Sequence, residues 1–361
     1  MTPFLLKPTG KDYIWGGTRL RDVFHKNLPL EPLAETWECS THPDGPSYVV
    51  SGEFEGLTLA EVLQAHPEFM GTSPSVASSN KLPVLIKFID ARNNLSVQVH
   101  PDDYYAYKEE NGQEGKTEMW YVVDAEPGAE LVFGLNRAVS ADELIQSLEK
   151  GTFEHYLRRL PVHKDDVFFI PSGTIHAIGR GALIAEIQQS SNLTYRLYDY
   201  GRVGKDGKPR ELHIDKALAV ADLSGSQSPR QPLRVLRYRP GFATESLARC
   251  QYFAVSRCLL HSPGVTFPAL PESFRVLLCI DGEGELWVPG SADSGNNGSM
   301  DSGNNGSTDS RIYGPTDSRN NGFTDQRNQG ITFRKGDTVF IPATAPELLL
   351  SGQAEFLLTR G

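Results

Sequence analysis

The sequence predicts a mainly β protein of the jelly-roll class, built from two similar β units with a small helical insert. Short runs of β-branched and aromatic residues recur along the chain between Gly, Pro, Asn or Asp, whereas helix signatures are few. Many short strands with few helices favour a sandwich or a barrel. The predicted strands include Val84–Ile89, Leu95–His100, Met119–Val123, Val167–Ile170, Leu183–Ile187, Val276–Ile280 and Thr338–Ile341.

Two helices are predicted from capping boxes, in which a Ser or Thr is followed three residues later by Glu. Thr58 precedes Glu61 in the first, and Ser140 precedes Glu143 in the second. The second helix, about Ala141–Glu149, carries two leucines at the i,i+4 spacing, so one of its faces can pack on a sheet.

An internal similarity supports the two units. Residues 165–176 resemble residues 336–347, and residues 118–124 can be aligned with residues 275–281. The units differ where chemistry is expected: the first has Glu118 and His176 at positions where the second has Arg275 and Glu347. The first unit therefore has residues suited to a metal ion, and the second resembles a scaffold.

The predicted domain organisation follows from this similarity. Residues 1–235 form the first unit, with the helical insert at about 137–160, and residues 236–361 form the second. A loop at 291–330 interrupts the second unit between two strand-like segments. Within it, an Asp recurs every eight residues among Gly, Asn and Ser, which cannot bury enough apolar surface to offset the entropy of ordering. We expect a flexible hairpin loop, with a calcium-binding repeat as the alternative.

Composition excludes several classes of function. The 361 residues carry a formal net charge of −10, which argues against binding nucleic acid through electrostatics. The apolar run Leu82–Ile89 has the length of a strand and is far too short to span a membrane, and no signal peptide is evident. The four cysteines form no CxxC pair, which favours free thiols in a reducing compartment. We therefore expect a cytoplasmic protein.

Polar residues that share strand faces form a candidate metal site. Alternation along Leu95–His100 places Ser96, Gln98 and His100 on one face, although that face could instead lie in solvent. In the same way Lys116 and Glu118 share a face, with a surface ion pair as the alternative.

A third segment, Pro171-Ser172-Gly173-Thr174-Ile175-His176, follows a buried strand and a tight turn, although a lone His there could simply belong to the core. Together Gln98, His100, Glu118 and His176 can form a first coordination shell for Zn²⁺ with an open position. Similar sites also take Mn²⁺, Co²⁺ or Fe²⁺.

At these residues the sequence closely resembles the type I mannose-6-phosphate isomerases, or phosphomannose isomerases, in their shorter bacterial form. The QVHP and TYRLYDYGR segments are the most specific, and the likeness is strong over about residues 1–225. The matching stretches lie at residues 14–17, 35–45, 83–103, 115–123, 168–178, 186–202 and 211–218.

The resemblance implies two cupin units, one zinc ion per chain and a set of site residues. It implies the metal ligands Gln98, His100, Glu118 and His176, the catalytic residues Arg196, Lys116 and Glu186, and the phosphate contacts Ser96 and Arg202. Two features depart from the family pattern: Asp165 replaces a glycine, and the eight-residue repeat is additional.

The expected reaction is the reversible interconversion of mannose 6-phosphate and fructose 6-phosphate through a cis-enediol. The zinc ion would act as a Lewis acid, Arg196 would stabilise developing charge, and Glu186 and Lys116 are the candidates for moving the proton. A sugar phosphate is the expected partner, with no nucleic acid and no membrane, and the chain is expected to be a monomer or a weak homodimer.

Alternatives remain at the level of function and of single residues. The chain could be a non-catalytic regulatory cupin that binds a sugar phosphate, or another metal-dependent cupin enzyme. Arg196 could form a buried pair with Asp199, and Arg202 could be an exposed loop cation. Lys87, inside an apolar strand, could approach the site or extend its amine to solvent.

Overall fold

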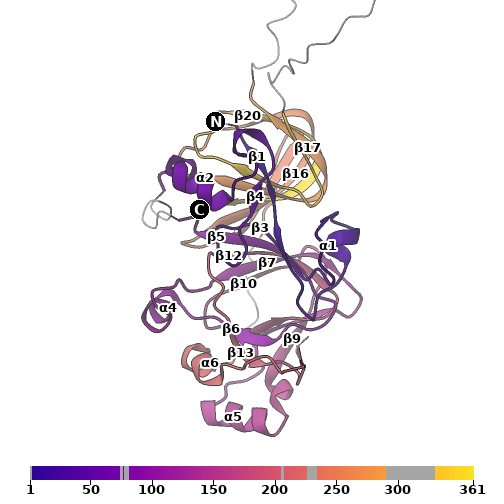
Figure 1. The fold of residues 1–361 in the computed structure, drawn as a ribbon. Coiled ribbons are helices and arrows are strands. Elements are labelled where there is room, and N and C mark those ends of the chain that lie inside the picture. The colour runs from indigo at the N-terminus through magenta and orange to yellow at the C-terminus, as the bar shows by residue number, and fades with distance from the viewer. Residues whose placement is uncertain (1, 74–75, 77–80, 205–206, 226–233, 290–329) are drawn as a thin grey trace, which may run out of the picture.

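The computed structural model describes residues 2–73, 76, 81–204, 207–225, 234–289 and 330–361 of the chain. Within these ranges the protein consists mainly of strands arranged in three sheets, so the predicted mainly β class is confirmed (Figure 1). The predicted repeat loop at 291–330 lies almost wholly outside the described residues. No helix in the described ranges has the length and apolar content that crossing a bilayer requires.

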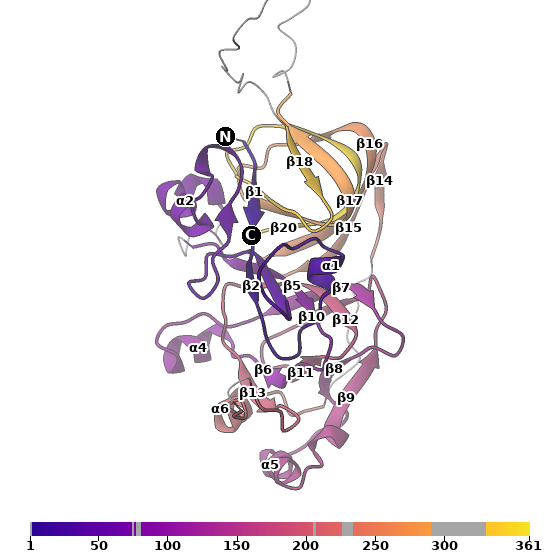
Figure 2. The ribbon, with the colours of Figure 1, turned by 45° about the vertical axis from the view of Figure 1, so that its right-hand side comes forward.

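The largest sheet has nine strands and is built mostly by the C-terminal part of the chain (Figure 2). The first residues of the protein also belong to it, because β1 pairs with β19 and β4 pairs with β1. Its strands, in spatial order, are β14 (Arg237–Arg239), β15 (Phe242–Arg249), β16 (Ala254–Phe267), β20 (Leu348–Arg360), β17 (Arg275–Trp287), β19 (Thr338–Ile341), β1 (Phe4–Lys7) and β4 (Tyr48–Val49), with β18 (Ile331–Arg334) paired to β17.

The other two sheets form a sandwich. Trp120 and Ile184 from the six-stranded sheet pack in one buried cluster with Leu131 and Ile178 from the five-stranded sheet. The six-stranded sheet runs β10 (Val167–Ile170), β7 (Glu118–Ala125), β12 (Ala182–Gln189), β5 (Val84–Asp90), β3 (Glu35–Cys39) and β2 (Thr9–Lys11). The five-stranded sheet runs β13 (Tyr195–Tyr198), β6 (Val97–Val99), β11 (His176–Ile178), β8 (Glu130–Leu135) and β9 (Leu157–Pro161).

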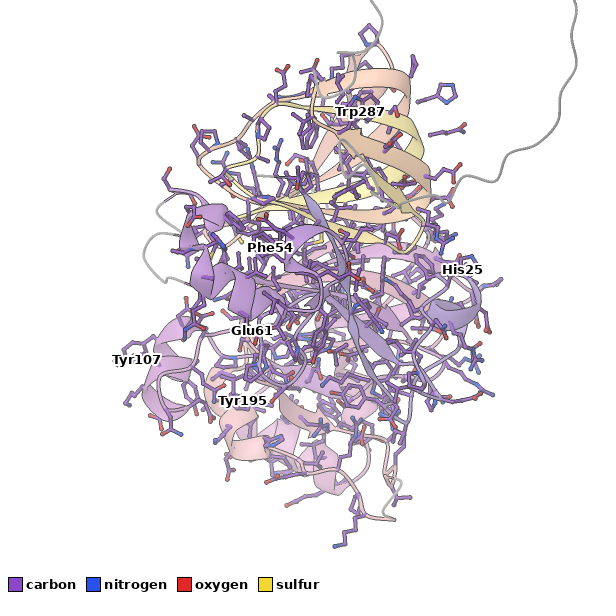
Figure 3. The ribbon with its side chains drawn as sticks, turned by 45° about the horizontal axis from the view of Figure 1, so that its top comes forward. His25, Phe54, Glu61, Tyr107, Tyr195 and Trp287 are labelled. Atoms are coloured by element: carbon purple, nitrogen blue, oxygen red, sulfur yellow. The ribbon has the colours of Figure 1, made fainter. Side chains whose placement is uncertain are left out.

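Both predicted helix starts are confirmed. Thr58 and Glu61 form a complete capping box, and the Ser140 side chain accepts a hydrogen bond from the Glu143 amide. Helix α4 carries Tyr107 on its outer face, as Figure 3 shows. The helices are α1 (Arg19–Asp22), α2 (Leu59–Ala65), α4 (Asp103–Glu109), α5 (Ala141–Glu149) and α6 (Ile214–Val220), with 3-10 turns at Gly52–Phe54, Pro67–Met70 and Phe153–Tyr156.

The two segment pairs that resemble each other in sequence also pair in the same register. In the six-stranded sheet, Ile170 of β10 lies opposite Glu118 of β7. In the nine-stranded sheet, Ile341 of β19 lies opposite Arg275 of β17. Each pairing continues for three further residues without a shift.

Buried polar contacts join the nine-stranded sheet to the sandwich. The Lys26 amine lies 2.7 Å from Oε2 of Glu38, and the Thr338 hydroxyl donates to the same oxygen at 2.8 Å. Asp165 has a backbone φ of +73°, a left-handed conformation that favours glycine, and its carboxylate accepts from the Tyr121 hydroxyl at 2.6 Å. Asp165, in place of the family glycine, therefore adds a side-chain hydrogen bond at a backbone conformation that is strained for residues other than glycine.

Candidate metal centre and active site

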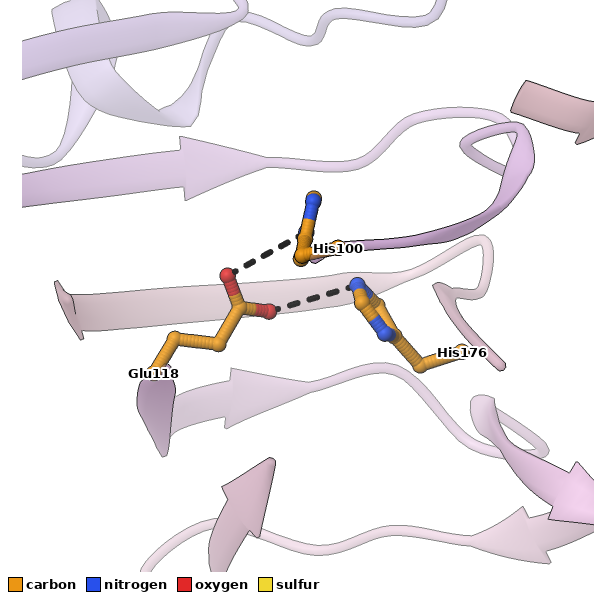
Figure 4. A group of neighbouring side chains, drawn as sticks. All are labelled: His100, Glu118 and His176. Atoms are coloured by element: carbon orange, nitrogen blue, oxygen red, sulfur yellow. Dashed lines mark ion pairs between the residues drawn. The ribbon is translucent and has the colours of Figure 1, made fainter. Parts of the chain in front are cut away.

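Three strands of the sandwich bring a buried metal-ligating group together (Figure 4). His100 follows β6 directly, Glu118 opens β7 and His176 opens β11. The Nε2 atom of His100 lies 3.5 Å from Oε2 of Glu118, and the Nε2 atom of His176 lies 3.3 Å from Oε1. Each of the three side chains is at most 1% exposed. The facing sheets thus direct two imidazoles and one carboxylate at a common point.

Backbone carbonyls orient both imidazoles. Nδ1 of His100 is 2.7 Å from the Leu193 carbonyl oxygen, and Nδ1 of His176 is 2.8 Å from that of Thr174. Because a carbonyl can only accept, each Nδ1 carries the proton and each Nε2 keeps its lone pair for the common point. Burial lowers the pKa of His176 to about 4 and that of His100 well below its usual value. Both rings are therefore neutral at pH 7, as a metal ligand must be.

Glu118 has two buried oxygens that accept no hydrogen bond from the described residues. The Lys116 amine approaches Oε2 to 2.7 Å as an ion pair. Burial, with the nearby carboxylate of Glu186, raises the pKa of Glu118 to about 7. Lys116 compensates this buried carboxylate on the Oε2 side, and a second cation can compensate it at the point that the two imidazoles share. Two neutral imidazoles and this carboxylate therefore fit a divalent metal ion with N and O ligands.

Gln98 lies at the edge of this group. It is the cross-strand neighbour of His176 on one side and of Arg196 on the other. Its amide nitrogen is 3.4 Å from Nε2 of His176, and the Ser96 hydroxyl is 3.5 Å from its amide oxygen. The predicted face of β6 is therefore directed into the sandwich rather than into solvent.

A cavity of about 340 Å³ opens beside the metal-ligating group. Gln98 and Lys116 line it, together with Glu186. The Lys116 amine is 3.2 Å from Nε2 of His100 and 3.8 Å from Oε1 of Glu186. Of the predicted residues, Ser96, Gln98, Lys116, Glu186 and Arg196 are thus brought to one cavity.

A row of aromatic and charged side chains crosses the six-stranded sheet at the cavity wall. Cross-strand pairing places Trp120, Glu186, Lys87 and Trp37 side by side on four adjacent strands. The Trp120 indole donates to Oε2 of Glu186 at 2.8 Å, and the Lys87 amine lies 3.3 Å from Oε1. Burial acts to raise the pKa of Glu186, but Lys116, Lys87 and the indole hydrogen bond hold it below its usual value. Glu186 is therefore ionised at neutral pH.

Lys87 lines the cavity, whereas the sequence left open whether its side chain approaches the site or extends to solvent. It is 4% exposed, and Glu35 lies 3.8 Å from its amine on the side away from Glu186. Its amine also lies 4.9 Å from the ring centroid of Trp37. The sequence signal was a single charge within an otherwise apolar strand, which is equally compatible with a side chain that reaches solvent.

Arg196 is directed at the cavity by two hydrogen bonds. Its Nε donates to the Ser96 hydroxyl at 3.2 Å, and its Nη1 donates to the Glu211 carbonyl at 2.8 Å. Burial lowers the pKa of Arg196, and the neighbouring guanidinium of Arg210 adds to this effect. Asp199 forms ion pairs with Arg202 and Arg210 instead of with Arg196.

Arg202 and Arg210 have different positions. Arg210 lines the cavity and donates from Nε to Asp199 at 2.8 Å. Arg202 does not line the cavity, and it donates to Asp199 and to the Asn94 carbonyl. Of these two arginines, Arg210 is therefore the one in contact with the cavity. Arg210 was not predicted, because the sequence alone does not distinguish the several cations of this region from one another.

A larger cavity of about 480 Å³ lies elsewhere, against α2 and the 112–114 loop. It is lined by His42, Gln64, Lys81, Glu114 and Ser191 among others, and by none of the metal-ligating residues. Ser191 donates to the Glu114 carbonyl at 2.9 Å, and both residues line this larger cavity.

The fold and the site define a class: a mainly β protein whose buried His–Glu–His group can hold a metal ion beside a cation-lined cavity. A family model described as phosphomannose isomerase type I, catalytic domain, matches residues 4–135. The mannose-6-phosphate isomerase ManA of Bacillus subtilis is 39% identical over 287 residues, covering 79% of this chain and 87% of that protein. The chain belongs to the type I phosphomannose isomerase family.

Two further comparisons agree. A mannose-6-phosphate isomerase of Streptococcus mutans is 44% identical over 218 residues, covering 60% of this chain and 67% of that protein. The crystal structure of the mannose 6-phosphate isomerase from Bacillus subtilis superposes with a TM-score of 0.81 at 32% identity and covers 99% of both chains. The family resemblance inferred from the sequence is therefore confirmed.

Proposed function

We propose that this protein is a mannose-6-phosphate isomerase that interconverts mannose 6-phosphate and fructose 6-phosphate. The observation that carries the proposal is the cavity beside the His100–Glu118–His176 group, in a chain 39% identical to a mannose-6-phosphate isomerase over most of its length. Four basic residues line this cavity, which suits a small anionic substrate: Lys87, Lys116, Arg196 and Arg210. No observation favours the non-catalytic alternative.

The metal is proposed to be one zinc ion, held by His100, Glu118, His176 and the amide of Gln98. Imidazole and carboxylate ligands favour zinc among the ions that such sites accept. When bound, zinc supplies Lewis-acid stabilisation for charge that develops on the sugar oxygens at C1 and C2. The two carbonyl contacts of the histidines support this role, because they fix the tautomer that coordination requires.

Proton transfer is proposed to involve Glu186, with Lys116 as its neighbour. Its Oε1 lies 3.3 Å from the Lys87 amine and 3.8 Å from the Lys116 amine, and the carboxylate lines the cavity. A carboxylate so placed can take the proton from C2 of the aldose and return it to C1 of the enediol, and the reverse reaction uses the same atom. Lys116 would hold this carboxylate in position through the 3.8 Å ion pair.

The substrate phosphate is proposed to lie near Ser96, Arg196 and Arg210. Guanidinium groups bind phosphate oxygens through paired donors, and the Ser96 hydroxyl adds a further one. Arg202, which the family resemblance implies as a phosphate contact, donates to Asp199 and is not among the residues that line the cavity. We propose that its part is indirect, since it holds the Asp199 carboxylate that orients Arg210.

We propose a two-cupin architecture because the strand pairs β7–β10 and β17–β19, which resemble each other in sequence, also pair in the same register. The proposed catalytic unit spans residues 1–235 with its helical insert at about 137–160, and the second unit spans 236–361. β1 and β4 are exceptions, because they pair within the nine-stranded sheet. A cytoplasmic location and a monomeric or weakly dimeric state belong to the same proposal.

Conversion of mannose 6-phosphate, followed by NMR from both directions, tests the proposed reaction. We expect the same equilibrium mixture from mannose 6-phosphate and from fructose 6-phosphate, and much slower conversion of unphosphorylated mannose. His176→Ala should lose bound metal and turnover together. If folded, metal-loaded protein leaves both sugar phosphates unchanged, the chain binds its ligand without catalysis and the proposal is wrong.

A further inference from the structure

A buried arginine in the nine-stranded sheet has unsatisfied hydrogen-bonding capacity. Arg275 opens β17 and is 5% exposed. Its side chain alternates with those of Leu277 and Cys279, which belong to the apolar core on that face of the sheet. Phe267 lies against the guanidinium, with 4.4 Å between Cζ and the ring centroid. A charged group therefore lies at the end of an otherwise apolar interior.

Only one nitrogen of this guanidinium donates a hydrogen bond within the described part of the chain. Nη1 donates to the Pro268 carbonyl at 2.7 Å. Nε and Nη2 are buried and donate to no group in the described part of the chain, and no carboxylate there pairs with Arg275. Nε–H and Nη2–H lie on the same edge of the guanidinium, which is the edge that grips two oxygens of one carboxylate or phosphate. The unused donors therefore form one complete fork.

An unpaired buried guanidinium is strongly unfavourable. Desolvation of a charge is offset only by an opposite charge or by hydrogen bonds to all its donors. Burial alone lowers the pKa of Arg275 to about 10, so the side chain stays protonated at neutral pH. Neutralisation by deprotonation is thus not the compensation, and among the described residues only the Pro268 carbonyl and the Phe267 ring offset the charge.

The position of Arg275 gives a second reason to expect a ligand. Arg275 lies opposite Ile341 as Glu118 lies opposite Ile170, and each is the first residue of its strand. Glu118 also marks the end of an apolar sandwich interior, where it belongs to the metal-ligating group. Equivalent positions of the two strand pairs thus carry an anionic side chain, Glu118, in the six-stranded sheet and a cationic side chain, Arg275, in the nine-stranded sheet.

We propose that Arg275 forms the centre of a buried anion site in the nine-stranded sheet, which takes a small oxyanion of the phosphate or carboxylate class. The oxyanion accepts from Nε–H and Nη2–H through two oxygens. Its route is the segment from Pro268 to Glu272, whose residues are largely exposed. That segment is held by the amides of Thr72 and Ser73, which both donate to the Glu272 carbonyl.

Thermal unfolding in inorganic phosphate tests the site, with the substrate cavity disabled so that binding there does not contribute. In an Arg196→Ala/Arg210→Ala background, which removes both guanidinium groups of the substrate cavity, phosphate at about a hundredfold excess over its dissociation constant should raise the unfolding midpoint by roughly 5 °C. Adding Arg275→Met should abolish the rise. Adding Arg249→Met, which removes an exposed arginine of the same sheet, should preserve it. A rise that survives Arg275→Met overturns the proposal, as does the absence of any rise.

A crystallographic measurement keeps the test decisive if Arg275→Met fails to fold. Crystals of the unaltered protein soaked in arsenate should give an anomalous peak within hydrogen-bond distance of Nε and Nη2 of Arg275. Arg275→Lys, which keeps the charge but lacks the fork, should bind the ion at least tenfold more weakly. A water-sized feature without anomalous signal at the fork would show that solvent alone satisfies these donors and would overturn the proposal.

Discussion

Arg196→Ala is the substitution whose effect follows most directly from the geometry of the cavity. The guanidinium uses Nε on Ser96 and Nη1 on the Glu211 carbonyl, and these two bonds fix its plane. Nη2 has no partner among the described residues and remains for the substrate. Removing one fixed donor of this kind lowers kcat by about 10²–10³-fold, equivalent to about 2.7–4 kcal/mol of transition-state stabilisation. We expect this loss in kcat, because charge develops on the sugar during reaction.

The assay is steady-state conversion of mannose 6-phosphate, with metal content measured on the same preparations. Arg196→Ala should retain its metal, because Arg196 is not among the metal-ligating residues. Arg249→Ala, which removes an exposed arginine of the nine-stranded sheet, is the matched control and should keep full activity. A kcat within threefold of the parent enzyme would refute the assigned role, and loss of the metal would show that Arg196 acts through the metal-ligating group instead.

Three further predictions concern the carboxylates and their cations. Glu186→Gln should keep the metal but lose exchange of the C2 proton with deuterium oxide, and unchanged exchange would transfer the proton role to another group. Lys87→Met leaves Glu35 and Glu186 without their shared cation, so chemical unfolding should show a loss of about 3 kcal/mol; an unchanged midpoint would contradict this. The pKa of Asp199 is lowered by Arg210 and Arg202 against the opposing effect of burial. Its contribution is therefore complete above the unfolded-state pKa and is lost as pH falls through the folded-state pKa. Asp199→Asn should accordingly destabilise by about 3 kcal/mol at pH 7 and by clearly less at pH 3. A destabilisation that is equal at both values would show that the ion pairs are not its cause.

Local sequence patterns predicted the elements whose determinants are local. Val167–Ile170, Thr338–Ile341 and Ala141–Glu149 have their predicted bounds in the structure. Helices α1, α4 and α6 were not predicted, and α1 has no side-chain cap that a sequence pattern would reveal. The pairing of β1 with β19 joins residues more than 300 positions apart, which no local pattern indicates.

The candidate site was predictable where it depends on strand alternation. Ser96, Gln98 and His100 share a face because side chains alternate along a strand, and this face turns inward. The positions of Lys87 and Arg210 could not be predicted in this way. That of Lys87 depends on which strands pair with its own. That of Arg210 depends on its contact with Asp199, eleven residues earlier in the chain. Sequence alone could place cations near the site but could not say which ones enter the cavity.

Metal removal and restoration tests the central claim most directly, namely that the His100–Glu118–His176 group supports isomerisation of mannose 6-phosphate. The measurement is formation of fructose 6-phosphate by one preparation before chelation, after chelation and after zinc is returned. We predict that activity disappears on chelation and returns with about one zinc ion per chain. Full activity in protein that contains no metal would contradict the account, because the buried carboxylate and imidazoles would then have no part in the reaction.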